Sequence, residues 1–409
     1  MRILIINRFF CEFSAGESLA WKTYQYLKEQ GHDVFFFATD RQPYFIENYE
    51  FSKFFPKDRF STIEYLKNPI SYYWDIEAMT KLELMLEYVK PDIVHVNQPI
   101  TMSIFSTLRK HKIPVVWTLH DSAIVCGTSL KMGNKGFCEK FLCKNGNYIN
   151  CFRKKCKDNK FEPSFRKMIL GYVNYFFNSY DCVDKFITPS IALKNIVLSS
   201  SLKLNKNKFI VLNNFVEAKQ KLQEKNLDKN SYFLYIGRLV EEKGIQIILE
   251  AAKDLPREIQ FLIVGKGEYE IQLKKLCKQY GLTNITFKGY VSYDNVDELY
   301  QNAIATIVPT LCFEAFGMIN IESFANKTPV IGSMVGGIPE IIEENSNGFL
   351  FEPTNIEKLK EIILTYWNNL NLSKLHGING YNKVLKYYNS NLYFKKLEIT
   401  YKEILDYEN

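Results

Sequence analysis

Residues 233–252 read FLYIGRLVEEKGIQIILEAA, and they contain an apolar run, a charged loop and an amphipathic stretch in that order. The run Phe233–Ile236 has the length of a buried strand, and the apolar residues in Ile247–Ala252 follow a helical pattern. A strand that leads through a short loop into a helix is the repeating unit of a parallel sheet covered by helices. This stretch therefore predicts an α/β fold.

The same alternation continues along the chain in both directions. Towards the amino end, strands are expected at Ile3–Ile6, Val34–Phe37, Ile93–Val96, Val115–Leu119, Phe186–Thr188 and Ile210–Leu212. Towards the carboxyl end, they are expected at Phe261–Val264, Ile285–Phe287, Thr306–Val308 and Val330–Ile331, with helices near Ile271–Tyr280, Val296–Asn302 and Ile319–Ala325. Two doubly wound halves in tandem follow, with ligands bound beyond the carboxyl ends of the strands, in the cleft between the halves.

The chain has 409 residues, which suits two domains better than one. We place an amino-terminal domain at 1–216, with a cysteine-rich insertion at about 122–160, and a carboxyl-terminal domain at 217–380. The tail, 381–409, has a helical pattern.

Composition is that of a globular protein, because 46% of the residues are hydrophobic and 24% are charged. This excludes a wholly disordered or fibrous chain. The net charge of +7 is unevenly spread: Lys140–Lys221 contains 16 basic and 5 acidic residues, so it carries +11 and leaves −4 for the remainder. Any partner selected by charge should therefore meet this segment.

The apolar run Ile3–Ile6 is too short for the apolar region of a signal peptide, and no run approaches the length of a membrane-spanning helix. We therefore expect a cytoplasmic location. The nine cysteines would then meet a reducing environment, which disfavours disulfides.

Two cations, Arg238 and Lys243, lie in the loop that follows the strand Phe233–Ile236. The arginine fork and the lysine point charge together suit a diphosphate and could stabilise it as a leaving group. The alternative is a solvated turn with a surface pair between arginine and glutamate.

A second segment, PTLCFEAFGMINIE at 309–322, leads from a strand into a helix. Glu314 lies in the loop, Gly317 at the helix start and Glu322 within the helix. Free amides at a helix N-terminus attract phosphate or sugar oxygens, and carboxylates beside them accept hydrogen bonds from sugar hydroxyls. The alternative is that both glutamates are ordinary acids on a helix surface.

These two segments occur in one order with Gly265–Gly267, Phe287–Val291 and Gly336–Glu340. The arrangement resembles the family 4 glycosyltransferases of the GT-B fold, in which two Rossmann-like domains face a central cleft. Such enzymes move a sugar from a nucleotide diphosphate donor with retention of anomeric configuration. The resemblance covers nearly the whole chain and is most specific between Gly237 and Glu340. It implies that the domain at 1–216 binds the acceptor, that the domain at 217–380 binds the nucleotide sugar, and that the tail at 381–409 packs back on the first domain.

The resemblance implies a role for each motif. Arg238 and Lys243 would bind the donor diphosphate, Glu314 the hydroxyls of the donor sugar, and Glu322 the ribose. The remaining donor contacts would come from two backbone segments, the cradle of Phe316, Gly317, Met318 and Ile319 and the turn of Gly289, Tyr290 and Val291 beside the base. The family has no agreed protein nucleophile, so Glu314 is not expected to act as one. It favours departure of the leaving group through an oxocarbenium-like state, with the acceptor attacking from the same face.

No two aspartates in the chain are separated by a single residue, so the metal-binding Asp-x-Asp signature of the other large glycosyltransferase fold is missing. Cationic side chains would then neutralise the diphosphate, which agrees with Arg238 and Lys243. We expect no divalent ion in catalysis.

In the first half, His120 follows the strand Val115–Leu119. The resemblance places a histidine after this strand near the donor sugar and the reaction centre, with Asp121 as a second candidate; the alternative is a histidine that caps the next helix. The first glycine loop reads Ala15-Gly16, where relatives commonly have two adjacent glycines. Gly16 still permits close approach to the phosphates or acceptor.

Five cysteines fall within 31 residues, and they are Cys126, Cys138, Cys143, Cys151 and Cys156. Four residues separate the members of each of the last two pairs, Cys138 with Cys143 and Cys151 with Cys156, a spacing compatible with a structural zinc knuckle. Free thiols and disulfides are the alternatives.

Arg153–Lys157, Arg166 and Lys167 precede the apolar and aromatic stretch Met168–Phe177. A cation-flanked apolar helix suits the surface of an anionic membrane, where the protein could meet a lipid-linked acceptor at the inner face. The alternative is a helix packed into the core.

The expected activity is that of a retaining, metal-independent hexosyltransferase. It would move a sugar from a UDP- or GDP-sugar to a glycan or lipid-linked acceptor in polysaccharide or cell-surface glycan synthesis. One alternative is a nucleotide-sugar epimerase on the same fold. The other, a zinc-containing nucleic-acid-binding protein, explains the basic segment but gives Arg238, Lys243, Glu314 and Glu322 no role, so nucleic acid is not an expected partner.

Overall fold

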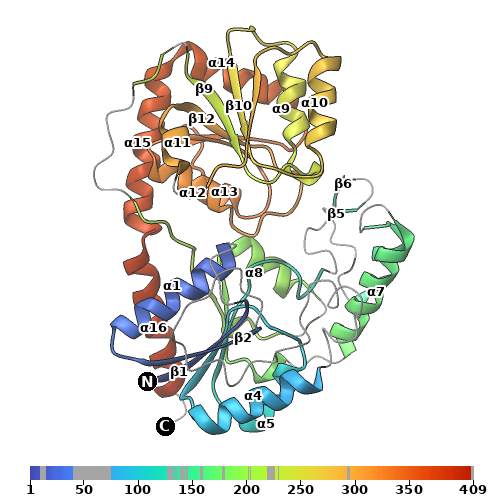
Figure 1. The fold of residues 1–409 in the computed structure, drawn as a ribbon, viewed down its shortest axis with the longest axis vertical. Helices are drawn as coiled ribbons and strands as arrows, with labels where there is room; N and C mark the ends of the chain where they lie inside the picture. The colour runs from blue at the N-terminus through green and yellow to red at the C-terminus, as the bar shows by residue number, and fades with distance from the viewer. Residues whose placement is uncertain are drawn as a thin grey trace.

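The computed structural model describes residues 1–9, 15–39, 75–126, 132–133, 136–138, 143, 146–156, 160–176, 180–200, 202, 204–218, 226–228, 230–292 and 295–406. Figure 1 shows two domains stacked along the long axis of the molecule, each built on a sheet with helices on its faces. Parts of the cysteine-rich insertion lie outside the described residues.

The first domain contains a six-stranded parallel sheet with the order β2-β1-β3-β4-β7-β8. Its strands are β1 (Arg2–Phe9), β2 (Asp33–Thr39), β3 (Ile93–Val96), β4 (Val115–Thr118), β7 (Lys185–Thr188) and β8 (Phe209–Val211). All six overlap predicted strands, because each contains a short run of mainly apolar residues, and every residue of the inner strands β3 and β4 is buried.

Alternation along β1 shows how both faces are covered. Leu4 and Ile6 belong to a core that includes residues of α4 (Ile76–Val89), α5 (Ile104–His111) and α8 (Ile191–Leu198). Ile3 and Ile5 face the opposite way, into a core with α1 (Ala15–Glu29) and α16 (Ser390–Asp406). The sheet is thus the middle layer of three.

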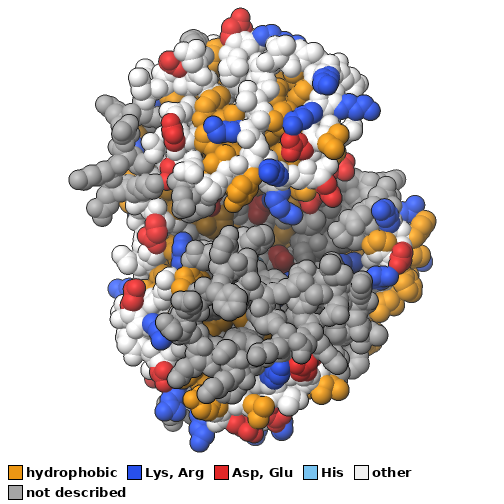
Figure 2. All heavy atoms as spheres, viewed as in Figure 1, with side chains coloured by type: hydrophobic (Ala, Val, Ile, Leu, Met, Phe, Trp, Pro, Cys, Tyr) orange, Lys and Arg blue, Asp and Glu red, His pale blue; other side chains and the backbone are white. Residues whose placement is uncertain are grey.

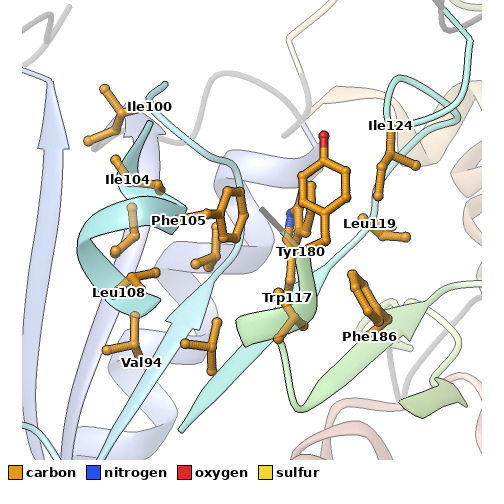
Figure 3. Packing of buried hydrophobic residues seen from close by; sticks show 14 of the residues in the cluster. Val94, Ile100, Ile104, Phe105, Leu108, Trp117, Leu119, Ile124, Tyr180 and Phe186 are labelled. Carbon is orange, nitrogen blue, oxygen red and sulfur yellow. The ribbon is translucent and has the colours of Figure 1, made fainter. Parts of the chain in front are cut away.

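Aromatic rings fill the core on the α5 side of this sheet (Figure 3). Phe105 of α5 packs on Trp117 of β4 with ring centroids 4.6 Å apart, and Tyr180 lies 5.2 Å from Trp117. Phe186 of β7 continues the stack at 5.9 Å from Trp117. This packing supports β4 just before His120.

The second domain contains another six-stranded parallel sheet, with the order β11-β10-β9-β12-β13-β14. Its strands are β9 (Tyr232–Ile236), β10 (Gln260–Val264), β11 (Ile285–Gly289), β12 (Ala303–Val308), β13 (Val330–Ser333) and β14 (Gly348–Phe351). The first five were predicted. The edge strand β14 was not, because four residues after a polar turn give little periodic signal.

The helices of the second domain include those expected from the sequence. They are α9 (Ile245–Ala252), α10 (Glu270–Gln279), α11 (Asp297–Gln301), α12 (Met318–Ala325), α13 (Ile338–Ile341), α14 (Ile356–Asn368) and α15 (Leu370–Tyr387). The insertion in the first domain contributes the hairpin of β5 (Met132–Gly133) and β6 (Gly136–Phe137) and the helix α6 (Ile149–Arg153), and α7 (Phe161–Phe176) follows it. None of the described helices is both long and apolar enough to cross a membrane.

The tail returns to the first domain, as Figure 1 shows. Helix α15 passes through residue 381, where we placed the start of the tail, and the chain crosses near Tyr388. There Val216 donates its backbone N–H to the carbonyl of Tyr388 at 3.0 Å, so the two interdomain crossings lie side by side. Beyond the crossing, the Tyr401 hydroxyl of α16 lies 2.6 Å from His95 Nδ1 in the first sheet.

Candidate active site

The loops after the strands of the two domains meet across a hollow that Figure 2 shows between the domains. Ser190, after β7, donates its hydroxyl to the carbonyl of Ala315, after β12, at 2.5 Å. Glu340 of α13 accepts hydrogen bonds from the amides of Ile191 and Ala192 at 2.8 and 2.7 Å. A carboxylate from the second domain therefore caps helix α8 of the first domain.

The predicted anion loop brings Lys243 against the second motif. Lys243 Nζ lies 2.7 Å from Glu314 Oε2, and the two side chains are 22% and 23% exposed. Burial lowers the pKa of Lys243, but the Glu314 charge and hydrogen bond outweigh it, so the pKa is raised and the ammonium stays charged. Arg238 is exposed nearby, and it forms no ion pair with a carboxylate of the described residues. The expected alternative, an arginine–glutamate surface pair, is not what forms here.

Two glycine contacts explain why these loops have their shape. Gly265 has φ +133°, and a Cβ there would lie 1.8 Å from the carbonyl oxygen of Gly237. Gly336 has φ +59°, and a Cβ there would lie 2.0 Å from the carbonyl oxygen of Glu314. The Gly265–Gly267 loop therefore supports the cation loop from behind, and Gly336 supports the loop of Glu314.

The segment from Phe316 to Ile319 leads into α12 and includes its first two residues. Gly317 precedes the helix with φ +99°, and its carbonyl accepts from the Asn320 amide at 2.9 Å. The first amides of a helix have no intrahelical acceptor, so this end offers N–H groups next to Glu314. The geometry suits an anionic or hydroxylated ligand.

Glu322 is half-buried on α12, where the Tyr300 hydroxyl donates to Oε2 at 3.2 Å. Desolvation raises the pKa of Glu322, while this hydrogen bond and the charge of Lys22 in α1 lower it. The expected alternative, a solvated helix acid, does not describe this position. Since Lys22 acts on Glu322, α1 borders the same region, and Gly16 lies in the first turn of α1.

The turn after β11 is open to solvent. Gly289 has φ +77°, and its carbonyl accepts from the amide of Gly265 at 2.8 Å. Tyr290 is 69% exposed, and Val291 packs partly against the core below. The tyrosine ring thus presents a free face beside the anion loop, and such a face suits a nucleobase.

His120 joins a chain of polar groups at the carboxyl edge of the first sheet. Its Nε2 lies 2.9 Å from Asn97 Oδ1, and Asn97 Nδ2 donates to Asn7 Oδ1 at 2.9 Å. Because the Asn97 oxygen accepts, the proton of the neutral ring is assigned to Nε2. Burial lowers the pKa of His120 to about 4, so the imidazole is neutral near pH 7.

Asp121, rather than His120, caps the following turn, since its Oδ1 accepts from the Ala123 amide at 2.7 Å. Asp121 retains exposed surface, yet protein surrounds most of the carboxylate, and this desolvation raises its pKa against the opposing charges of Arg8 and Lys167. A pocket opens beside it, lined by Arg8, Asn97, Gln98, Pro99, Met102, Trp117, Thr118, Leu119, His120, Asp121, Ala123 and Ile124.

Sequence reasoning missed Arg8 and Asn97 in this pocket. Arg8 lies near the end of β1 and Asn97 directly follows β3, and both strands belong to the sheet of β4. The position of a polar residue at a strand end was the available signal, but strand order was needed to bring the residues together.

The cysteines of the insertion pack partly together. Cys143, Cys151 and Cys156 belong to a small cluster with Tyr148 and Met168, and a hydrogen bond joins the thiols of Cys151 and Cys156. Burial raises the pKa of Cys143 to about 12. All five cysteines of the insertion are free thiols, and among the described residues no group of three His, Cys, Asp or Glu is placed to hold a metal ion. The zinc knuckle of Cys138, Cys143, Cys151 and Cys156 stays a prediction.

Two family models match this sequence. The model described as Glycosyltransferase Family 4 matches residues 16–220, and the model described as Glycosyl transferases group 1 matches residues 216–383. Together they span residues 16–383, which leave out β1 and Arg8 but include the motif loops of both domains.

Curated relatives agree with these models. An uncharacterized glycosyltransferase of Methanocaldococcus jannaschii is 34% identical over 197 residues, which are 48% of this chain and 53% of that protein. CapM, a capsular polysaccharide biosynthesis glycosyltransferase of Staphylococcus aureus, is 26% identical over 228 residues, which are 54% of this chain and 59% of CapM. The chain thus spans about half the length of these curated relatives.

A solved structure shares the fold. HepE of Anabaena, in complex with UDP, has a TM-score of 0.64 at 15% identity, over 98% of this chain and 100% of HepE. At this identity the likeness concerns the architecture alone: two Rossmann-like domains that face a cleft.

Proposed function

Because the chain belongs to glycosyltransferase family 4 and has the GT-B fold, we propose that it is a retaining glycosyltransferase. Its donor is a UDP- or GDP-sugar, and its acceptor is a glycan or a lipid-linked glycan in polysaccharide or cell-surface synthesis. HepE, a fold relative, is recorded with UDP, and CapM is named for capsular polysaccharide biosynthesis; both support the choice of substrates.

One observation carries the proposal: Lys243 pairs with Glu314 at 2.7 Å, close to Arg238 and the start of α12. The arrangement provides two cations for a diphosphate and a carboxylate for sugar hydroxyls within one loop cluster. Glu314 retains Oε1 as an acceptor while Oε2 holds Lys243 in place.

In the proposed reaction the bond between the anomeric carbon and the diphosphate oxygen breaks, and a bond from an acceptor oxygen to that carbon forms on the same face. The proton of the acceptor hydroxyl passes to the departing diphosphate. Negative charge grows on the departing diphosphate, where Arg238, Lys243 and the first amides of α12 stabilise it. These groups provide the neutralisation that a divalent cation would otherwise supply, so the proposed reaction is independent of metal.

His120 is well suited to a position beside the donor sugar. Positive charge develops on the sugar in an oxocarbenium-like state, and a cation nearby would oppose it. Because burial lowers the pKa of His120 to about 4, its ring contributes hydrogen-bonding capacity without charge. Glu322 and Tyr290 are the proposed contacts for the ribose and the base.

The test is a panel of UDP- and GDP-sugars, each incubated with and without glycan acceptors and with EDTA. We expect acceptor-dependent nucleotide release with one donor, unchanged by EDTA, and a product whose anomeric configuration matches the donor by NMR. Isomerisation of the sugar without nucleotide release would indicate an epimerase. Failure of every donor to bind would refute the proposal.

A further inference from the structure

We propose that α7 and its surroundings form a docking surface for an anionic lipid membrane. The surface consists of the exposed apolar side chains of α7, which are Phe161, Phe165, Ile169 and Phe176, together with the cations around them. We call it the α7 face. It lies on the outer side of the first domain, where Figure 2 shows orange and blue side chains together.

The apolar side chains of the α7 face lie on one side of the helix. At 100° per residue, the four positions fall within an arc of about 80°. They are 56%, 48%, 43% and 74% exposed in chain order. Scattered exposed apolar residues are common on soluble proteins, but four in one stripe form a continuous apolar surface.

The side of α7 next to this stripe is firmly packed. Met168 is buried in a cluster with Tyr148 and Cys151, and a Cβ added to Gly171 would lie 2.3 Å from the Tyr148 ring. The expected alternative, a core-packed helix, therefore describes one side only. The predicted stretch Met168–Phe177 is divided between the two sides, and its last residue lies outside the described residues.

Helix α6 extends the apolar stripe. The ring of Phe152 lies 5.6 Å from that of Phe161 and 5.8 Å from that of Phe165, so three aromatic rings adjoin at one end of α7. Lys155 Nζ lies 4.0 Å from the centroid of the Phe161 ring. Cations thus begin directly at the edge of the apolar surface.

The charges around the α7 face indicate which partner it binds. Within 146–156 and 160–176, the cations are Arg153, Lys154, Lys155, Lys160, Arg166 and Lys167, and the one acid is Glu162. Glu162 is paired with Arg166 at 2.6 Å. A second copy on this face would bring two sets of cations together, whereas an anionic bilayer attracts the cations and accepts the aromatic rings at its interface.

The α7 face also lies next to the pocket of the first domain. The charge of Lys167 in α7 acts on Asp121, which lines that pocket beside His120. If the protein transfers sugar to a lipid-linked acceptor, as proposed above, docking through α7 would bring the acceptor side of the cleft to the membrane. The docking itself can be measured without any substrate.

The experiment is co-sedimentation of the full chain with vesicles of phosphatidylcholine alone or with about 30% phosphatidylglycerol. We expect sedimentation with the anionic vesicles at low salt, weaker sedimentation at high salt, and little with neutral vesicles. Phe161→Ser/Phe165→Ser and Arg153→Ser/Lys154→Ser should each weaken binding by about tenfold or more.

Matched controls lie elsewhere on the surface. Ile271→Ser removes an apolar side chain that is 83% exposed, and Lys395→Ser/Lys396→Ser removes two exposed cations from α16. Both should bind vesicles like the unmodified protein. Calorimetry should show that every variant still binds the nucleotide sugar. A variant that binds the nucleotide sugar but not the vesicles has lost membrane docking only, so the docking proposal and the proposed activity are tested separately.

Three results would overturn the proposal. The protein could remain in the supernatant with anionic vesicles at low salt, or the α7 variants could sediment as well as the controls. The third is self-association in ultracentrifugation that Phe161→Ser/Phe165→Ser abolishes, without vesicle binding, because a second copy would then be the occupant.

Discussion

Lys243→Met removes one charge of the Lys243–Glu314 pair and keeps a side chain of similar length. The charged atoms lie 2.7 Å apart, and the side chains are 22% and 23% exposed. Exposed pairs contribute about 0–1 kcal/mol, whereas breaking a fully buried pair costs about 3–5 kcal/mol. For this intermediate burial, the free energy of unfolding should fall by about 1–2 kcal/mol, measured by urea unfolding.

The effect on activity should be larger than the effect on stability. If Lys243 stabilises the departing diphosphate, kcat/KM for transfer should fall by about 10²–10³-fold, which is about 2.7–4 kcal/mol of transition-state stabilisation. The lower stability of the variant alone would not produce this fall in kcat/KM, because most of the protein stays folded after a loss of that size. Initial rates of nucleotide release measure the fall.

The variant Lys243→Met/Glu314→Gln separates the two effects. It leaves no unpaired charge, so most of the lost stability should return while activity stays low. Recovery of activity in this double variant would refute direct contact with the diphosphate, since Lys243 would then act only by holding Glu314. Near-normal turnover of Lys243→Met would remove Lys243 from the site altogether. Lys275→Met, at an exposed position in the same domain, is the matched control.

Four further predictions concern stability, cysteine chemistry and metal content. Glu340→Ala removes the cap that accepts from the amides of Ile191 and Ala192, so it should lower the free energy of unfolding by about 0.5–2 kcal/mol in urea titrations, whereas Glu343→Ala, at a side chain that is 58% exposed, should cost less. Burial lowers the pKa of His95 to about 3 and of His120 to about 4, so as the pH falls the unfolded chain takes up protons before the folded protein does. The stability that these neutral histidines contribute is fully present above about pH 6.5 and falls towards pH 4, by up to about 1.4 kcal/mol per pH unit for each histidine. His95→Gln should make the dependence of the free energy of unfolding on pH less steep. Partial burial raises the pKa of Cys143 and Cys182 to about 12, so both thiols should react slowly with iodoacetamide at pH 8 in the folded protein, and labelling of either within minutes by mass spectrometry would contradict the raised pKa. If the zinc knuckle forms, protein purified without added zinc should carry one zinc per chain, and a stoichiometry near zero would remove it.

The strands were predictable because a doubly covered parallel sheet needs short, mainly apolar runs. Ile93–Val96 is such a run, apolar except for His95, and all four residues are buried. This apolar pattern did not identify β14 (Gly348–Phe351), because the strand has only four residues and follows directly after a turn. An edge strand of this length is defined by its partner β13, not by its own pattern.

The candidate site was predictable where one residue marks the end of one strand, as His120 does after β4. It was not predictable where two elements must first become neighbours. Asn97 contacts His120 only because β3 and β4 are adjacent, and Glu340 caps α8 only because the domains meet there. The exposed side of α7 was hidden for a related reason, because apolar residues occur on both of its sides and only packing shows which remain outside.

Helix α16 makes the order of synthesis matter. Its residues Tyr393, Phe394 and Leu397 complete the core that contains Ile3 and Ile5 of β1, yet the ribosome translates α16 after the whole second domain. During translation the second domain can therefore fold first, while one face of the first domain's sheet remains exposed. Chaperones and proteases should recognise that face in nascent chains that stop before α16, although such chains already contain every residue of the candidate site.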